Sequence, residues 1–390
     1  MKITRLPIVL LLLVFVVISS INTQNIHAQE TCTHNGTGWG TASLWSCGRV
    51  PLITDDVIIP SGNNSILNVN DAFAANLTIE GTIQFGSNNV NRTLTVANDI
   101  NVANTGNLVP NSAGGSPVHT LTVSGNMTNN GNVDLRSAAS ATGSAVVNVI
   151  FNGTAVQNIE GTNPIRFNSL TVNDAVHVHI DTQPTVEGSL TNNGTLSQSF
   201  MVDNAAFEFL HILNLAGDTS KYRGVNINTV NNLGLVTVFV DGIDTSNGEY
   251  CTSTGAGSPD YTERCYTITA DNPNNSATVR LWAANSELND IPTSGLTPYH
   301  WNSSASEWQP LSAVTTGSEG TFSYAEGTTS SFSSFLLGGD AAAPTAVSLA
   351  NIFISSSHLT GFGWAAGLLA VLTLIVIGLW LRPAAHRPAS

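Results

Sequence analysis

Two histidines and an aspartate alternate with apolar residues at His177, His179 and Asp181. Alternate side chains of an extended strand point to the same side, so both imidazoles and the carboxylate are expected on one face. These groups are ligands that transition metals accept in proteins. The sequence offers no further ligand beside them, and the same alternation fits a row of polar side chains facing solvent. Metal binding here is therefore one of two open interpretations.

A second pair of acidic residues, Asp55 and Asp56, directly precedes the apolar run 57–59. Carboxylates are the ligands that calcium prefers. Aspartate at the start of a strand also caps backbone amides in a turn. Both interpretations stay open, and calcium is the one cofactor that the sequence suggests.

Four cysteines occur, Cys32, Cys47, Cys251 and Cys265. An even number in an exported chain predicts disulfides, and four cysteines allow three connectivities. Pairing Cys32 with Cys47 and Cys251 with Cys265 is the simplest, because each pair lies within one short segment. Zinc is the alternative, but no C-x-x-C pair and no nearby histidine pair supports it.

No catalytic motif is recognisable in the chain, which has no G-x-S-x-G, no H-E-x-x-H and no phosphate-binding glycine loop. A glycoside hydrolase needs two carboxylates about 5–10 Å apart across a cleft. The acids that could serve are candidates by type only: Glu80, Asp99, Asp134, Glu160 and Glu187. We therefore expect a protein that is not an enzyme, with a polysaccharide-degrading enzyme as the alternative.

Both ends of the chain predict its topology. Residues 1–28 have the basic start, apolar run and small residue before the cleavage point that are typical of a signal peptide. Residues 362–381 form 20 uncharged positions, which as a helix measure roughly 30 Å and match the hydrocarbon core. Arg382 and Arg387 follow, so a cytoplasmic tail at 382–390 and an extracellular N-terminal body are expected in the cell membrane.

Residues 29–361 contain all 26 acids but only one lysine and seven arginines, a formal charge of −18. Nucleic acid and anionic headgroups are therefore not expected as partners. Divalent cations or basic partners fit this charge better, although solubility of an exposed surface explains it equally well.

Between the termini, apolar residues alternate with polar ones, as in strands with one buried face. In the first half these short strands recur about every 20 residues with Asn-Gly corners, and residues 123–133 align without a gap to residues 186–196. This pattern predicts an all-β chain with a β-solenoid at 29–200, although a β-sandwich remains the alternative there. Residues 201–338 have longer strands and more aromatics, which favours a β-sandwich, and 339–361 are a small-residue stalk.

Two stretches also resemble known families. The segments 39–51 (WGTASLWSCGRVP) and 54–62 (TDDVIIPSG) resemble the start of bacterial surface modules of the G8-like, right-handed parallel β-helix type. The segments 275–282, 286–288, 299–302 and 331–337 resemble a sandwich module found before the membrane anchor of large bacterial surface proteins. The resemblance implies display at a bacterial surface and implies no reaction.

We therefore expect a single-pass, surface-anchored structural or adhesion protein. Its solenoid would contact an extracellular carbohydrate or protein ligand through a flat face of Thr and Asn side chains. A polysaccharide-binding module is the alternative, and it would expose a row of aromatic side chains.

Overall fold

The computed structural model describes residues 29–86, 89–111, 115–136, 145–242 and 260–339, all of them within one compact unit, Met1–Ala342. These residues are almost entirely β-structure, as predicted. Their helical parts are three short turns, η1 (Ala42–Leu44), η2 (Asn285–Glu287) and η3 (Thr293–Gly295). In this part of the chain no helix is long and apolar enough to cross a membrane. The predicted signal peptide, membrane span and tail, and the stalk beyond residue 339, lie outside it.

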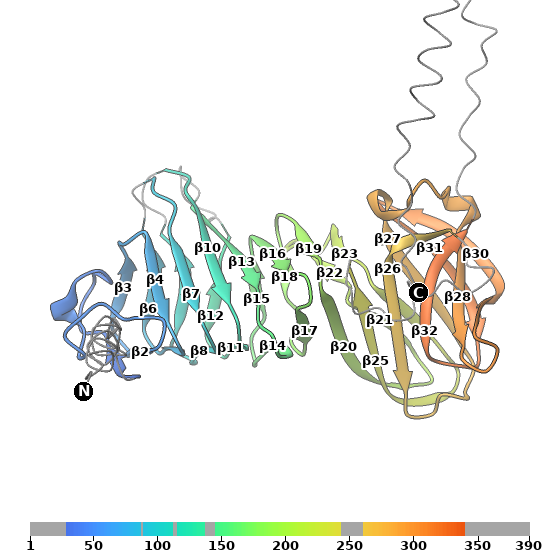
Figure 1. The fold of residues 1–390 in the computed structure, drawn as a ribbon, viewed down its shortest axis with the longest axis horizontal. Helices are drawn as coiled ribbons and strands as arrows, with labels where there is room; N and C mark the ends of the chain where they lie inside the picture. Colours follow the sequence, from blue (N-terminus) through green and yellow to red (C-terminus); the bar gives the residue numbers. More distant parts are fainter. Residues whose placement is uncertain (1–28, 87–88, 112–114, 137–144, 243–259, 340–390) are drawn as a thin grey trace, which may run out of the picture. The chain divides into compact units, whose positions relative to one another are not determined.

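The first half forms three parallel sheets, and the chain visits them in turn, one strand each, before starting the next rung (Figure 1). The first sheet begins with β1 (Thr31–Thr33), β2 (Asp56–Ile59), β5 (Leu77–Ile79), β8 (Ile100–Val102), β11 (Met127–Asn129), β14 (Gln157–Glu160) and β17 (His177–Ile180). The second contains β3 (Asn64–Leu67), β6 (Thr82–Phe85), β9 (Asn107–Pro110), β12 (Asn132–Asp134), β15 (Ile165–Phe167) and β18 (Thr185–Val186). The third contains β4 (Asp71–Ala74), β7 (Thr93–Val96), β10 (Val118–Val123), β13 (Val146–Phe151), β16 (Ser169–Val172) and β19 (Leu190–Asn192). This arrangement fits the predicted solenoid.

Apolar side chains stack in columns inside the solenoid because neighbouring rungs are in register. Val57 pairs with Leu77, Leu77 with Ile100 and Ile100 with Met127, and all four are buried. Since side chains alternate along a strand, in-register pairing sends every second residue of each rung into the same core. The alternation in the sequence is the direct cause of this packing.

The rungs differ in length, and most of the extra residues fall at one corner. Val57 pairs with Leu77, 20 positions later, whereas Met127 pairs with Ile159, 32 positions later. In the longer rungs the added residues connect the second sheet to the third, between β6 and β7, β9 and β10, and β12 and β13. The irregular spacing of the repeats therefore leaves the core columns intact.

Glycine and asparagine build the other two corners. A Cβ at Gly106 would lie 2.1 Å from the Ile79 carbonyl oxygen, and one at Gly131 would lie 2.2 Å from the Ala103 oxygen. At the corner before the first sheet, Asp99 accepts a bond from the Asn126 amide at 2.7 Å. These positions therefore require either glycine, which has no side chain, or a residue whose side chain hydrogen-bonds to the backbone of the next rung.

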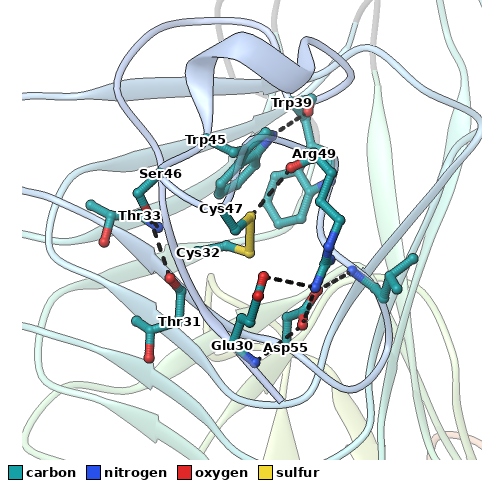
Figure 2. Close-up of a disulfide and its surroundings, with 11 residues drawn as sticks. Glu30, Thr31, Cys32, Thr33, Trp39, Trp45, Ser46, Cys47, Arg49 and Asp55 are labelled. Atoms are coloured by element: carbon teal, nitrogen blue, oxygen red, sulfur yellow. Dashed lines mark hydrogen bonds and ion pairs between the residues drawn. A yellow bond between two sulfur atoms is a disulfide. The ribbon is translucent and has the colours of Figure 1, made fainter. Parts of the chain in front are cut away.

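A disulfide and two tryptophans cover the N-terminal end of the solenoid (Figure 2). Cys32 in β1 is bonded to Cys47, as predicted, and β1 extends the first sheet beyond β2. Trp39 and Trp45 pack edge to face with ring centres 4.9 Å apart, and the Trp45 indole donates to the Trp39 carbonyl at 2.7 Å. This segment shields the apolar end of the first rung from water.

The second half consists of longer antiparallel strands in two sheets. The first sheet continues through β20 (Thr195–Asp203), β25 (Asn232–Asp241), β26 (Asp260–Ala270), β32 (Ser334–Gly339), β28 (Thr297–Asn302) and β29 (Glu307–Pro310). A fourth sheet contains β21 (Ala206–Phe209), β24 (Val225–Asn228), β27 (Ala277–Ala284), β31 (Phe322–Thr329) and β30 (Ser312–Glu319). The second sheet ends with β22 (Ile212–Leu213) and β23 (Ser220–Tyr222).

Strand β20 belongs to both halves. It pairs in parallel with β17 of the last solenoid rung and antiparallel with β25 along nearly its whole length. The expected boundary between residues 200 and 201 falls inside this strand. The two halves are therefore continuous through backbone hydrogen bonds rather than joined by a linker.

The core columns generate a first prediction. Replacing Leu121, which is fully buried and paired with Leu94 and Val149, by Ala leaves a cavity that a stacked column cannot close easily. We expect a loss of about 2–5 kcal/mol in unfolding free energy, measured by denaturant titration. The adjacent Thr122→Ala change faces outward and should cost less than about 1 kcal/mol. Equal losses for both variants would contradict the assignment of faces.

Candidate functional site

His177, His179 and Asp181 lie together at β17, as the alternation predicts. The His177 Nε2 and His179 Nδ1 atoms each lie 2.7 Å from the Ser197 hydroxyl oxygen on the neighbouring strand β20. The other nitrogen of His179 lies 3.3 Å from an Asp181 carboxylate oxygen. The sequence pattern did not reveal Ser197, because the pairing of β17 with β20 brings it to the histidines.

These contacts define a proton arrangement. A serine hydroxyl has one proton, so it donates to one imidazole and accepts from the other. If the Nε2 proton of His179 points to Asp181, its Nδ1 accepts from Ser197, and Ser197 accepts from His177. Burial lowers the pKa of His177, and the nearby His179 lowers it further. With this assignment Ser197 connects the two imidazoles by hydrogen bonds, and Asp181 lies beside the far side of the His179 ring.

The two ring nitrogens converge on a serine hydroxyl rather than on a third residue of the predicted ligand set. Ser197 is buried and its hydroxyl occupies the point on which the two ring nitrogens converge. Among the residues that the structure describes, no three His, Cys, Asp or Glu side chains are grouped to hold a metal ion. The arrangement instead connects the last solenoid rung to the strand shared with the second half.

Asp55 serves as a buried backbone cap. Its carboxylate accepts from the Leu52 amide at 2.7 Å and from Arg49 Nη2 at 2.9 Å, and Arg49 Nη1 is a second contact (Figure 2). The hydrogen bond from Arg49 holds the pKa of Asp55 below its usual range. Asp56 accepts from Gln29 at 2.9 Å and Asn76 at 2.7 Å. Asp55 thus has the backbone contact expected for the capping interpretation, whereas the contacts of Asp56 are with side-chain amides.

The second predicted disulfide joins Cys251 and Cys265, and the structure describes only the latter residue. Cys265 in β26 is disulfide-bonded. Cys251 lies outside the described residues, so its pairing with Cys265 stays a prediction.

The acids considered for hydrolysis are distributed over the solenoid. Asp134 and Glu187 both pair with Arg136, at 2.6 and 3.3 Å. Glu160 accepts from Thr128 at 2.7 Å, and Asp99 caps a backbone amide. The structure thus brings Asp134 and Glu187 together at Arg136, whereas Glu160 bonds to a neighbouring strand, Asp99 lies at a corner and Glu80 is exposed just after β5.

The outer face of the third sheet is the most regular surface of the solenoid. Its outward residues form two columns across the rungs. One column contains Asp71, Thr93, Thr120, Asn148 and Ser169, and the other contains Phe73, Thr95, Thr122, Ile150, Thr171 and Thr191. The outward apolar pair Val118 and Val146 lies beside the first column. The sequence predicted a face of Thr and Asn, and the structure places it on this sheet.

Charge distinguishes this face from the other two. Its only charged outward side chain on a described strand is Asp71, at the start of β4. The first sheet presents Asp56 and Glu160 on its outer side, and the second presents Asp134 and Arg166. In a chain with a net charge of −14, the third sheet offers an almost neutral surface.

Several polar residues in the core were missed by sequence reasoning. His119 is fully buried and Arg92 is 6% exposed, and the Arg92 amide donates to His119 Nδ1 at 3.2 Å. Gln157 donates to the carbonyls of Val123 and Gly125 from inside the core. The alternation around His119 gives the only signal, because it places that residue at an inward position of β10.

Comparison with models of protein families, with curated proteins and with solved structures found no match. The resemblance to G8-like modules and to membrane-proximal sandwich modules therefore stays a prediction.

The shared hydroxyl generates a second prediction. Ser197→Ala removes the partner of two partly buried ring nitrogens, so we expect a loss of about 1–3 kcal/mol in unfolding free energy. The matched control is Ser199→Ala on the same strand, whose hydroxyl contacts only the half-buried Thr237 hydroxyl. A loss no larger than that of the control would show that Ser197 does not bridge the histidines.

A third prediction concerns acid stability. Burial, reinforced by the charge of Arg92, lowers the pKa of His119 from 6.5 to about 4. Between pH 6.5 and 4, His119 therefore binds a proton in the unfolded chain but not in the native state. The free energy of unfolding consequently falls as the pH drops from 6.5 towards 4. The total loss from this group is roughly 3 kcal/mol.

Thermal unfolding across this pH range would measure the loss. His119→Gln, which does not titrate, should flatten the acid limb, whereas Thr120→Gln on the outer face should leave it unchanged. An unchanged acid limb in the His119 variant would contradict the assignment.

Proposed function

We propose that this chain is a cell-surface structural and adhesion protein whose solenoid contacts a neutral extracellular carbohydrate through the outer face of the third sheet. The proposal assigns residues 1–28 to export, the β-sandwich at 201–338 and the stalk at 339–361 to display, and residues 362–381 to a membrane anchor. The tail at 382–390 is cytoplasmic, and the body is extracellular. No catalytic residue and no cofactor is part of the proposal.

The observation that carries the proposal is the nearly neutral, hydroxyl-rich third sheet in a strongly acidic chain. Thr93, Thr95, Thr120 and Thr122 present hydroxyls that both donate and accept hydrogen bonds, beside methyl groups. Sugars offer the same combination of hydroxyls and apolar C–H surface. A charged ligand would find no opposite charge there apart from Asp71.

The aromatic residues of the second half favour this face over an aromatic platform. Trp282, Tyr266 and Phe335 are buried, and the Tyr266 hydroxyl donates to the Trp282 carbonyl at 2.6 Å. These side chains stabilise the core between the two sheets. Tyr261 is 38% exposed and Trp301 is only partly buried, so a carbohydrate-binding module that stacks sugars on aromatics stays the alternative.

A fourth prediction tests the face. We expect cells that display the full chain to adhere to immobilised neutral polysaccharides and to keep adhering when ionic strength rises from about 0.05 to about 0.5 M, because neutral contacts are not screened. Thr95→Lys combined with Thr122→Lys should lower adhesion about tenfold, since it introduces two charges that binding must desolvate.

The matched control is Thr78→Lys combined with Thr82→Lys, on the outer sides of the first and second sheets. Both double variants should reach the surface in equal amounts, measured with an external antibody. Equal adhesion of the two variants, or adhesion abolished by salt, would contradict the proposal.

A further inference from the structure

We infer that the outer face of the third sheet recognises the flat surface of an ordered, insoluble neutral polysaccharide rather than an isolated sugar chain. The inference rests on the proposed function and specifies its ligand. Four properties of the face support it: its regular lattice, its stiffness, its small area and its near-neutral charge.

The lattice follows from the register. Thr93 pairs with Thr120 and Thr95 pairs with Thr122, with no shift between β7 and β10. The same register continues from β10 through β13 to β16. Neighbouring positions in a column are therefore about 4.8 Å apart, and the two columns are separated by about 6.6 Å. A periodic surface can contact such an array at many points at once.

The side chains of this array are held in place. Threonine is branched at Cβ and has restricted rotation about χ1. The residues between the threonines, Leu94 and Leu121, are fully buried, which fixes the strands from below. Binding therefore orders few side chains, and little conformational entropy is lost on contact.

The small area limits the strength of a single contact. From β4 to β19 there are five rung steps, so the two columns cover roughly 24 Å by 10 Å. The resulting area of roughly 250 Å² is well below the ~800 Å² per partner of a stable protein interface. The face has one aromatic side chain, Phe73, which is 37% exposed. One contact of this kind is weak, and useful affinity requires many copies on a continuous surface.

Charge selects the same kind of ligand. The face is almost neutral while residues 29–361 have a formal charge of −18, so an anionic polymer is repelled by the remainder of the molecule. A neutral crystalline polysaccharide such as cellulose combines flatness, periodicity and the absence of charge.

The test uses cells that display the full chain and suspensions of microcrystalline cellulose. We expect the cells to be retained, and an excess of soluble cellohexaose to leave retention within about twofold of its starting value, because single chains cannot engage many copies. The Thr95→Lys and Thr122→Lys double variant should lose about tenfold of the retention, and the Thr78→Lys and Thr82→Lys control should keep it.

The outcomes separate the two levels of the proposal. If soluble cellohexaose abolished the retention of cells on cellulose, the inference would be overturned while carbohydrate adhesion stayed intact. Adhesion to gels of neutral, non-crystalline polysaccharides without retention on cellulose would also overturn the inference and leave carbohydrate adhesion intact. No retention on any neutral polysaccharide, with normal surface display, would overturn both. Adsorption to ice crystals without retention on any neutral polysaccharide would assign the lattice to crystalline water and would overturn both.

Discussion

In-register stacking of the rungs is the constraint on which the remainder of this structure depends. Most inward residues are apolar and pack on an apolar partner of the neighbouring rung, as Leu94 does on Leu121. A shift of one residue would turn every core side chain of that strand to solvent. The corners must therefore absorb all differences in rung length, and the longer connections between β6 and β7, β9 and β10, and β12 and β13 do so. The same register that builds the core aligns the threonines outside it.

Strand β20 transmits this order to the second half. Its parallel pairing with β17 and its antiparallel pairing with β25 make the first sheet continuous across both halves. Within the second half, Arg264 connects the two sheets, because it donates to the Arg223 carbonyl at 2.5 Å and to the Trp282 carbonyl at 3.1 Å while pairing with Glu287. This buried arginine links β26 to the fourth sheet through hydrogen bonds, which are directional, whereas apolar packing is not.

Sequence reasoning predicted those features that follow from local alternation. It predicted the solenoid strands, the common face of His177 and His179, and the Cys32–Cys47 disulfide. It did not predict which strands pair across long separations, so Ser197 and the continuity through β20 were missed. The aligned repeats show the limit clearly: Val123 ends a strand of the third sheet, whereas its counterpart Val186 lies in the second sheet. Equivalent strand-and-corner motifs recur on different sides, because a corner motif encodes a turn and not its place in the rung.

The most direct measurement of the central claim is the register of the third sheet, tested by paired cysteines in the full chain. Thr95 and Thr122 are register partners, so their Cα atoms lie about 4.8 Å apart, within the range that a disulfide spans. Thr93 and Thr122 are offset by two residues, which places their Cα atoms about 8 Å apart, beyond that range. The account predicts that peptide mapping after mild oxidation finds a cross-link in the Thr95→Cys, Thr122→Cys variant and none in the Thr93→Cys, Thr122→Cys variant. A cross-link only in the offset pair, or equal yields in both, would contradict it.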